Sequence, residues 1–458
     1  MSDIQNDSKK RPPQPAGHWL LGNLPDFRTD AIRLFLNATE EHGDIIRLRL
    51  FNREAWLLRH PEHIRYVLHS NYKNFSKNTR GIQYISHILG QGLLTSDGDH
   101  WLRQRRIAQP AFHRKRLVGF VETMTQCAEG MVEEWAQYDR DAIVDLGDEM
   151  TRVTLRIAGL TLFSSDVSGN ASAIFDAMHE CMQLTLHRIG KAITPPVHWP
   201  PPKNRRFDRA RAMLDETVYG LIEERRKTEE RPPDLLSMLM DARDEESGEQ
   251  MNNKQLRDEA LTLLLAGHET TANALTWTWY LLTQNPEPAA KMREELDRVL
   301  DGRLPTLEDL PNLVYTTQVA REGLRMMPPG WVFGRSPIEA DEIGGYPVAP
   351  GTLVMMSSFT THRHPEFWEE PERFMPERFA NDAHKDLHPF AYFPFGGGPR
   401  KCIGHGFAMM EMQVILAALA QRFEMTLKPG YSPSFEQLIT LRPLEGMPVT
   451  ISPRSLSC

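Results

Sequence analysis

Short apolar stretches with β-like patterns open the chain, and long stretches with helical spacing follow them. Residues 45–50 and 55–58 carry alternating or β-branched apolar side chains, which predicts a small hairpin. From about residue 61 to residue 300 the pattern is helical, although prolines at 194–202 interrupt it, because proline cannot continue a helix. Residues 228–258 mix charge with short apolar spacing, and we expect exposed helices and loops there.

After Met327 the chain becomes richer in proline and glycine and carries short β-like stretches at 353–356 and 438–451. No internal repeat, low-complexity block or clear linker divides the sequence. We therefore predict a mainly α fold with small peripheral sheets. It should form one domain over 18–458, preceded by a polar, proline-rich tail at 1–17.

The most apolar helix is expected at 261–280, where hydrophobic residues occupy nearly every face, so this helix should run through the centre of the protein. Asn252 and Asn253 are candidate caps at its start, and Asn285-Pro286 is a stop signal. Polar residues inside such a helix need an explanation.

Four polar residues, His268, Glu269, Thr270 and Thr271, interrupt this apolar helix. A buried polar group without a partner costs about 2–7 kcal/mol, so a structural or a chemical role is required. The structural alternatives are a helix face that opens to solvent, or threonine hydroxyls that bond to carbonyl groups four residues earlier. A zinc site of the HExxH type is excluded, because Ala272 stands where the second histidine would be.

Composition excludes several classes of protein. The chain has 458 residues, 40% of them hydrophobic, which is enough for a large core. Its 53 Lys and Arg against 61 Asp and Glu give a net charge of −8, which offers no support for nucleic-acid binding. No signal peptide is visible and no apolar run approaches the roughly 18 residues that span a bilayer, so we expect a cytoplasmic protein without a membrane anchor.

The four cysteines lie far apart without a CxxC pair, so neither a disulfide framework nor a zinc site is expected. A lone cysteine is usually a small buried hydrophobe. Around Cys402, however, residues 393–410 read FPFGGGPRKCIGHGFAMM, and a helix with one apolar face should begin just after the cysteine. The positive end of that helix would favour a thiolate.

Three glycines, Gly396, Gly397 and Gly398, precede this cysteine and would let the backbone approach a flat ligand closely. A phosphate-binding Walker loop is the rival interpretation, but its Gly-Lys-Ser/Thr ending is missing. The segment therefore favours a ligand other than a phosphate.

Phe395, Gly398, Arg400, Cys402 and Gly404 form the pattern F-x-x-G-x-R-x-C-x-G, which resembles the haem-ligand loop of the cytochrome P450 family. The resemblance implies a P450 fold in which Cys402 is the axial thiolate of haem b. It also implies that Phe395 packs near the sulfur and that Arg400 contacts a haem propionate. Thiolate ligation pushes electron density onto iron and favours O–O cleavage.

The apolar helix also resembles the family, through its A-G-x-[DE]-T segment. Ala266, Gly267, Glu269 and Thr270 match that segment, where a widened helical turn receives dioxygen. The resemblance implies that Gly267 leaves space for oxygen, while Glu269 and Thr270 deliver protons.

Trp101 and Arg105 lie four residues apart and so share a helix face, which a basic surface helix would explain by itself. In the family, W-x-x-x-R contacts a haem propionate. Arg335 resembles a further propionate ligand, and buried carboxylates need such cations.

Glu322 and Arg325 lie three residues apart, as many exposed helical pairs do. With the later P-E-R-F motif they resemble the family's buried Glu-Arg-Arg network. We choose Arg378 over Arg373 as its third member, because Arg378 closes the motif nearer to Cys402. The implied role is structural.

The resemblance implies a cytochrome P450 monooxygenase that inserts one oxygen atom from O₂ into a lipophilic small molecule such as a fatty acid or terpenoid. Electrons would come from a ferredoxin or flavodoxin-type donor with its reductase, because too few residues follow Cys402 for a fused reductase. The alternatives are a peroxygenase, which usually lacks the acid and alcohol pair, a non-catalytic haem-thiolate sensor or haem carrier, and a structural protein without haem.

A donor could dock on a basic patch, although a solvated basic face is an equally good interpretation. The candidate patch residues are Arg103, Arg106, Arg114, Lys115, Arg116 and Lys401. The segments expected to face substrate are 81–94, 182–193, 261–270, 331–333 and 439–441. Within them, the side chains expected in the substrate pocket are Tyr84, Ile85, Ile88, Leu89, Val332 and Phe333.

Overall fold

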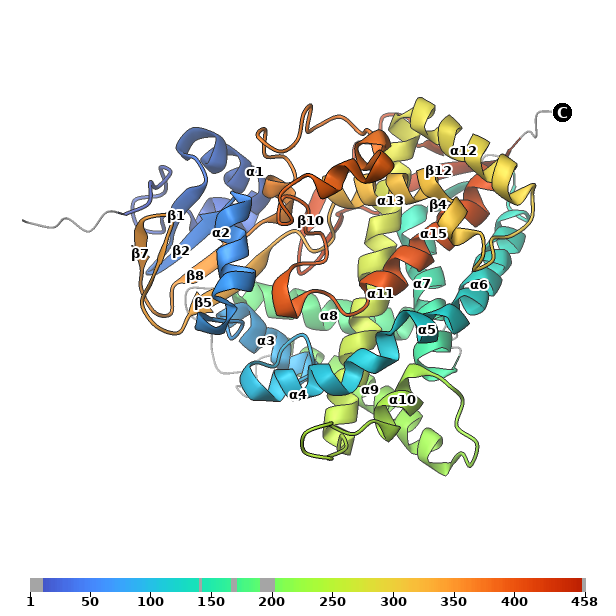
Figure 1. Ribbon diagram of the computed structural model, residues 1–458, viewed down its shortest axis with the longest axis horizontal. Helices are drawn as coiled ribbons and strands as arrows, with labels where there is room; N and C mark the ends of the chain where they lie inside the picture. The colour runs from blue at the N-terminus through green and yellow to red at the C-terminus, as the bar shows by residue number, and fades with distance from the viewer. Residues whose placement is uncertain (1–10, 140–141, 166–170, 190–201, 455–458) are drawn as a thin grey trace, which may run out of the picture. The chain divides into compact units, whose positions relative to one another are not determined.

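Figure 1 shows the chain as a computed structural model, which describes residues 11–139, 142–165, 171–189 and 202–454. Contacts within the chain divide it into two compact units. Unit 1 comprises residues 1–80, 332–371 and 387–401, and unit 2 comprises residues 81–331, 372–386 and 402–458.

Unit 1 contains a five-stranded sheet with the strand order β1-β2-β8-β5-β3. β1 (Ile45–Leu50) and β2 (Arg53–Leu58) form the antiparallel hairpin that the alternating pattern predicted (Figure 1). β8 (Leu353–Met356) runs parallel to β2, and β5 (Phe333–Pro337) is antiparallel to β8 and β3 (Phe75–Ser76). One face of this sheet buries an apolar core that includes Trp56, Leu58, Val354, Phe390 and Phe393.

The remaining elements of unit 1 are short, apart from the first helix. They are α1 (Leu24–His42), α2 (Pro61–Arg65), η1 (Tyr66–Ser70), η2 (Tyr72–Asn74), β6 (Asp341–Ile343), β7 (Tyr346–Val348), α14 (Ser358–Thr361) and η8 (Gly398–Arg400). The described part of the N-terminal segment packs onto this unit. The Arg47 amide donates to the Pro13 carbonyl at 2.8 Å, and the Asn23 side chain donates to the Ala16 carbonyl at 2.9 Å.

Unit 2 is mostly helical. Its helices are α3 (Arg80–Leu89), α4 (Gly98–Ala108), η3 (Gln109–Phe112), α5 (Arg114–Leu117), η4 (Val118–Phe120), α6 (Val121–Trp135), α7 (Leu146–Phe163), α8 (Ala171–Ile189), α9 (Pro202–Lys227), α10 (Leu235–Asp241), α11 (Asn253–Gln284), α12 (Pro286–Leu300), η6 (Leu310–Asn312), α13 (Val314–Met326), η7 (Pro376–Lys385) and α15 (His405–Arg422). Its strands are β4 (Ile143–Asp145), β9 (Phe423–Leu427), β10 (Phe435–Gln437), β11 (Leu441–Pro443) and β12 (Pro448–Pro453). The fold is thus mainly α with small separate sheets, as predicted.

The 32-residue helix α11 is the apolar helix that the sequence predicted, and it packs against α7, α9, α13 and α15. Its start is fixed by a capping box: the Asn252 side chain accepts from the Gln255 amide, and the Gln255 side chain accepts from the Asn252 amide, both at 2.9 Å. The helix ends at Gln284, two residues before Pro286, as expected.

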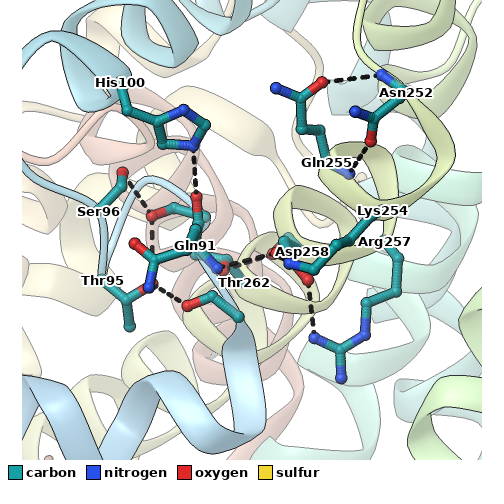
Figure 2. A network of polar contacts seen from close by, with 12 residues as sticks. Gln91, Thr95, Ser96, His100, Asn252, Lys254, Gln255, Arg257, Asp258 and Thr262 are labelled. Atoms are coloured by element: carbon teal, nitrogen blue, oxygen red, sulfur yellow. Dashed lines mark hydrogen bonds and ion pairs between the residues drawn. The ribbon is translucent and has the colours of Figure 1, made fainter.

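A polar network ties the loop between α3 and α4 to the first turns of α11 (Figure 2). The Asp258 carboxylate accepts from the Gln91 amide at 2.9 Å and from the Lys254 ammonium at 2.9 Å. Gly90 has φ +65°, and a methyl group there would lie 2.1 Å from a carboxylate oxygen of Asp258. The loop can approach the helix this closely only because Gly90 has no side chain.

The segment between α9 and α11 departs from the prediction of exposed structure. Leu235, Leu236 and Leu239 of α10 are at most 2% exposed and belong to the core of unit 2, so the prediction was wrong for this helix. The prolines expected to break the pattern at 194–202 lie, up to residue 201, outside the described residues. Within the described ranges, no helix has the length and apolar character that crossing a membrane requires.

Candidate active site

Cys402 lies three residues before α15, with its side chain exposed. The helix that we expected directly after the cysteine begins at His405, and the His405 ring nitrogen Nδ1 lies 3.1 Å from the Cys402 carbonyl oxygen. The N-terminal end of a helix presents unpaired amide N–H groups and partial positive charge. Cys402 therefore stands at the end of α15 that suits a thiolate.

α4 carries the two residues expected to share a helical face. Trp101 is buried at 7% exposure, while Arg105 is half-buried. Burial lowers the pKa of the Arg105 guanidinium, and the charge of Cys402 opposes that change. A charge affects the pKa of another group only when the two lie close together. Arg105, the predicted propionate ligand, therefore lies near Cys402, the predicted iron ligand.

Two of the glycines before the cysteine are needed for packing within unit 1. A methyl group at Gly398, which has φ +66°, would lie 1.9 Å from the Leu68 carbonyl oxygen, and one at Gly397 would lie 2.2 Å from the Phe390 ring. The expectation that these glycines also admit a flat ligand stays a prediction.

The other residues predicted near the haem also belong to unit 1. Phe395 and Arg400 are half-buried. Arg335 is buried on β5, and its guanidinium donates to the Gly334 carbonyl at 2.8 Å. Both arginines therefore remain candidates for carboxylate contacts.

Most of α11 is buried, but one turn in its middle is not, and we call this turn the opening in α11. Residues 256–265 and 271–279 are buried, whereas Ala266 is exposed and Gly267, Glu269 and Thr270 are half-buried. α11 continues through this opening without a break, and the widened turn that the resemblance implied stays a prediction. The Thr270 hydroxyl donates to the Ala266 carbonyl at 2.8 Å, which is the structural alternative considered for this residue.

Glu269 is held by the C-terminal hairpin of β10 and β11. The Thr440 hydroxyl donates to Glu269 Oε1 at 2.6 Å, and the Asn273 side chain donates to the Thr440 oxygen at 3.3 Å. Beside it, His268 is completely buried and donates to the Leu264 carbonyl at 2.7 Å when its Nδ1 carries the proton. Burial lowers the pKa of His268, so this imidazole is neutral near pH 7.

Next to Glu269 lies a small pocket of about 10 Å³, formed by α8, α11 and the segment that leads into β11. It is lined by Met178, His179, Met182, His268, Glu269, Leu438, Ile439 and Arg442. Three of the segments expected to face substrate contribute to this lining, namely 182–193, 261–270 and 439–441, although residues 190–193 lie outside the described residues.

These features of unit 2 fit a haem. The exposed thiol supplies a soft anionic ligand at a helix N-terminus, the nearby arginine supplies a cation for a carboxylate, and the opening in α11 exposes polar groups from a buried helix. Comparison with known proteins decides the family, since the cytochrome P450 family model matches residues 12–447.

The chain belongs to the cytochrome P450 family. Members of this family bind haem b through a cysteine thiolate, and Cys402 is the cysteine of the matching motif. The protein is a cytochrome P450 monooxygenase.

Several relatives are named as a synthase, a monooxygenase or an oxygenase. The chain is 37% identical to cyclooctatin synthase and 36% identical to cyclooctat-9-en-7-ol 5-monooxygenase, both from Streptomyces melanosporofaciens. The matches cover 90% of both chains in the first comparison, and 86% of this chain and 85% of the relative in the second. Pentalenene oxygenase of Streptomyces avermitilis is 32% identical over 86% of this P450 and 87% of the relative.

The Glu-Arg-Arg residues meet within unit 2. Arg325 Nε donates to Glu322 at 2.7 Å, and Arg378 Nε lies 3.4 Å from the other carboxylate oxygen. The Met375 amide also donates to Glu322, at 2.9 Å. Arg378 rather than Arg373 provides the second guanidinium, while Arg373 offers its backbone carbonyl to Arg325 at 3.3 Å. Glu322 and Arg325 are fully buried, so neither charge could remain there alone.

The side chains expected in the substrate pocket come from both units. Ile85, Ile88 and Leu89 are buried in the core of unit 2, and neither they nor Tyr84 line the small pocket beside Glu269. Core packing gives the same apolar sequence pattern as a pocket wall, so their place in a substrate pocket stays a prediction. Val332 and Phe333 belong to unit 1, where the Phe333 and Phe393 rings lie 5.8 Å apart.

The polar side of this pocket was not predicted from the sequence. His179 Nε2 lies 3.5 Å from an Arg442 nitrogen, and Arg442 forms an ion pair with Glu436. A sequence motif of fixed spacing cannot connect His179 on α8 with Glu436 and Arg442 on a hairpin that is distant in sequence. The only available signal was the unusual run of polar residues in an apolar helix, which Thr440 and Asn273 now explain.

Proposed function

We propose that this P450 inserts one oxygen atom from O₂ into a terpenoid-like molecule. The opening in α11 carries the proposal, because it leaves an acid and an alcohol half-buried in a helix that is buried on both sides of them. The relatives that include cyclooctatin synthase and pentalenene oxygenase support this class of substrate.

Each residue of the site has a distinct task in this proposal. The haem, when bound to Cys402, activates dioxygen and supplies the redox chemistry. Thr270 holds a hydroxyl at the opening of α11, where it can exchange its bond to Ala266 for one to a reacting oxygen. Glu269 provides the exchangeable proton, and Thr440 fixes the direction of its carboxyl group.

The electron donor is a separate ferredoxin or flavodoxin-type protein in this proposal. A groove of about 690 Å³ in unit 2 runs between η6, α13 and the start of α15 and is lined by residues including Val118, Val314, Ile403 and Met410. Lys115 and Arg116, three and two residues before Val118, are exposed. An apolar groove close to cations suits an acidic carrier.

Two of the six cations expected to form the basic patch are ion-paired within the chain. Arg103 donates to Glu249 at 2.6 Å, and Arg106 pairs with Asp244 at 3.0 Å and with Glu246 at 2.8 Å. These ion pairs compensate two of the cations within the chain. Lys115 and Arg116 are therefore the residues to test for donor docking.

The oxygenase proposal is tested by reconstituting the purified holoenzyme with NADPH, a [2Fe–2S] ferredoxin and its reductase. With farnesol as probe and isotopically labelled dioxygen, we expect a product that contains one labelled oxygen. Thr270→Ala should retain haem but release most electrons as hydrogen peroxide, whereas Thr270→Ser, which keeps the hydroxyl, should remain coupled.

A haem protein that forms no oxygenated product from a terpenoid panel would favour the alternative of a sensor or haem carrier. Coupling that is unchanged in Thr270→Ala would remove the proton-delivery role. For the donor, Lys115→Glu with Arg116→Glu should slow ferredoxin-driven reduction about tenfold at low salt and leave dithionite reduction unchanged. Equal reduction rates in the variant and the parent would exclude docking at these cations.

A further inference from the structure

A turn near the start of unit 1 presents two adjacent apolar side chains to solvent. Trp19 is 81% exposed and Leu20 is 47% exposed, whereas every other tryptophan that the structure describes is at most 7% exposed. The turn is closed by two hydrogen bonds of 2.8 Å, which join the backbone amide of each of His18 and Gly22 to the carbonyl of the other. We call residues 18–22 the Trp19 turn.

Hydrogen bonds from side chains hold the Trp19 turn in shape. The Arg49 guanidinium, on β1, donates to the carbonyl groups of His18 at 2.9 Å, Trp19 at 2.8 Å and Leu20 at 2.8 Å. His18 Nδ1 accepts from the Leu20 amide at 3.2 Å and from the Leu21 amide at 3.1 Å. The exposure of Trp19 is therefore built into unit 1, and a turn that is already held in place loses little conformational freedom when it binds.

The tip of the β1–β2 hairpin lies beside this turn, because the Phe51 amide donates to the Leu21 carbonyl at 2.9 Å. Phe51 begins the loop between the paired residues Leu50 and Arg53, and its φ is +60°. Glycine usually occupies such a position, since a bulky side chain is strained there. The ring of Phe51 is only half-buried, so a second apolar side chain reaches the surface next to the Trp19 turn.

The charges at the Trp19 turn are positive, although the whole chain has a net charge of −8. Residues 11–25 contain no acidic residue, and Arg11 is exposed. Among the described residues, the side chain of Arg49 bonds to backbone carbonyls and forms no ion pair. Glu54, which lies opposite Arg49 on β2, pairs with Arg47 at 3.6 Å instead. No carboxylate therefore neutralises Arg49 at this turn.

This combination of groups fits an anionic lipid surface better than a protein partner. A stable protein interface buries about 800 Å² on each partner and has a packed apolar core, whereas one turn and one hairpin tip supply the apolar side chains here. A lipid surface needs no matching shape. Tryptophan is favoured at the boundary between headgroups and acyl chains, and nearby cations are attracted to anionic headgroups.

We propose that the Trp19 turn docks unit 1 on an anionic lipid surface, with Trp19 and Leu20 inserted among the headgroups and with Arg11 and Arg49 close to the lipid phosphates. Such docking is peripheral, and it requires no helix that crosses the bilayer. The inference does not depend on the substrate named in the proposed function. It places the protein where lipophilic molecules accumulate.

The first test measures how much of the holoenzyme sediments with lipid vesicles. The vesicles consist of phosphatidylcholine alone or of phosphatidylcholine mixed with phosphatidylglycerol. We expect about tenfold stronger binding to the mixed vesicles, and this difference should shrink as salt is added, because salt screens the attraction between the cations and the headgroups. Equal binding to the two compositions, or no binding to the mixed vesicles, would overturn the proposal.

A double variant tests the apolar side chains themselves. Trp19→Ala with Leu20→Ala should weaken binding to the mixed vesicles about tenfold, because less apolar surface leaves water. The matched control is Ile143→Ala, which removes a side chain that is 59% exposed on β4 of unit 2 and should bind as the parent does. If the double variant bound as tightly as the parent, the Trp19 turn would not be the docking site.

Tryptophan fluorescence gives a second readout that reports on the turn. Because the other described tryptophans are buried, a blue shift of the emission on addition of mixed vesicles should come from Trp19. Trp19→Phe keeps an aromatic ring, so it should still bind the vesicles but lose the blue shift. A shift that persisted in Trp19→Phe would assign the lipid contact to another part of the chain. A dimer that the double variant abolished would identify a second copy as the partner, and it too would overturn the proposal.

Discussion

Thr440 donates a 2.6 Å hydrogen bond to Glu269 across 171 residues of sequence. The bond joins the C-terminal hairpin to the opening in α11, and Asn273 supports it from the following turn of the helix. A carboxyl group that must transfer a proton needs a defined orientation, which a half-exposed glutamate would not have by itself. The hairpin therefore helps to position the acid as well as to line the pocket.

Replacing Thr440 should uncouple the reaction without removing the haem. Thr440→Val keeps the shape of the side chain but loses a hydrogen bond worth about 1 kcal/mol, so Glu269 gains rotational freedom. We expect the ratio of product to NADPH consumed to fall several-fold, while Thr440→Ser restores it. A ratio that stays the same in Thr440→Val would show that Glu269 does not need this partner.

Cys402→Ser should abolish the band at about 450 nm in the reduced carbon monoxide complex, because an alcohol does not replace the thiolate. Cys181→Ser is the matched control. Burial raises the pKa of the Cys181 thiol to about 12, so this cysteine remains protonated and should not ligate iron. If the band survived in Cys402→Ser, the assignment of the ligand would be wrong.

Arg378→Leu should destabilise the protein, because Glu322 is buried and would lose one of its two cations. Breaking a buried ion pair at one member typically costs about 3–5 kcal/mol. Arg373→Leu removes an exposed side chain and leaves the backbone carbonyl that Arg325 uses, so its effect should be small. Denaturant unfolding of the two variants measures the difference, and equal midpoints would contradict the choice of Arg378.

Glu259 should make stability depend on pH. It accepts from the Leu93 amide at 3.0 Å, and burial raises its pKa to about 8 from an ordinary value of 4.5. The folded state therefore binds a proton that the unfolded state has already released, so stability falls as pH rises from about 4.5 to about 8 and then levels off.

Glu259→Gln keeps the shape of this side chain without titrating. The gap in melting temperature between the parent and the variant should widen in favour of Glu259→Gln as pH is raised from 6 towards about 8. Glu230→Gln, at an exposed position, should follow the parent at every pH. A constant gap would mean that Glu259 is ionised in the folded protein over this range.

Regular spacing explains what the sequence could predict. The hairpin of β1 and β2, the start of α11 after Asn252 and its end before Pro286 all depend on local rules of alternation, capping and proline. The partnership of Glu322 with Arg378 was also expected, although only through a motif resemblance. Local patterns and family motifs thus located most of the elements and many of the candidate site residues.

Other features depend on residues that are distant in sequence. Ile85 and Ile88 have the composition of a pocket wall, but they pack into the core, and spacing cannot distinguish these environments. Arg106 appeared available to a partner until the structure placed Asp244 beside it. The contact between Arg442 and His179 was missed for the same reason, because the two residues are 263 residues apart.

A methyl group at Gly398 would lie 1.9 Å from the Leu68 carbonyl oxygen. This close approach limits how the enzyme can be re-engineered. Backbone atoms cannot move aside as a flexible side chain can, and the positive φ of Gly398 adds a second penalty. Mutational libraries aimed at new substrates gain nothing by sampling this position. Diversity is better placed at other positions, such as Met178 and Ile439, where a change of side chain leaves the cysteine loop intact.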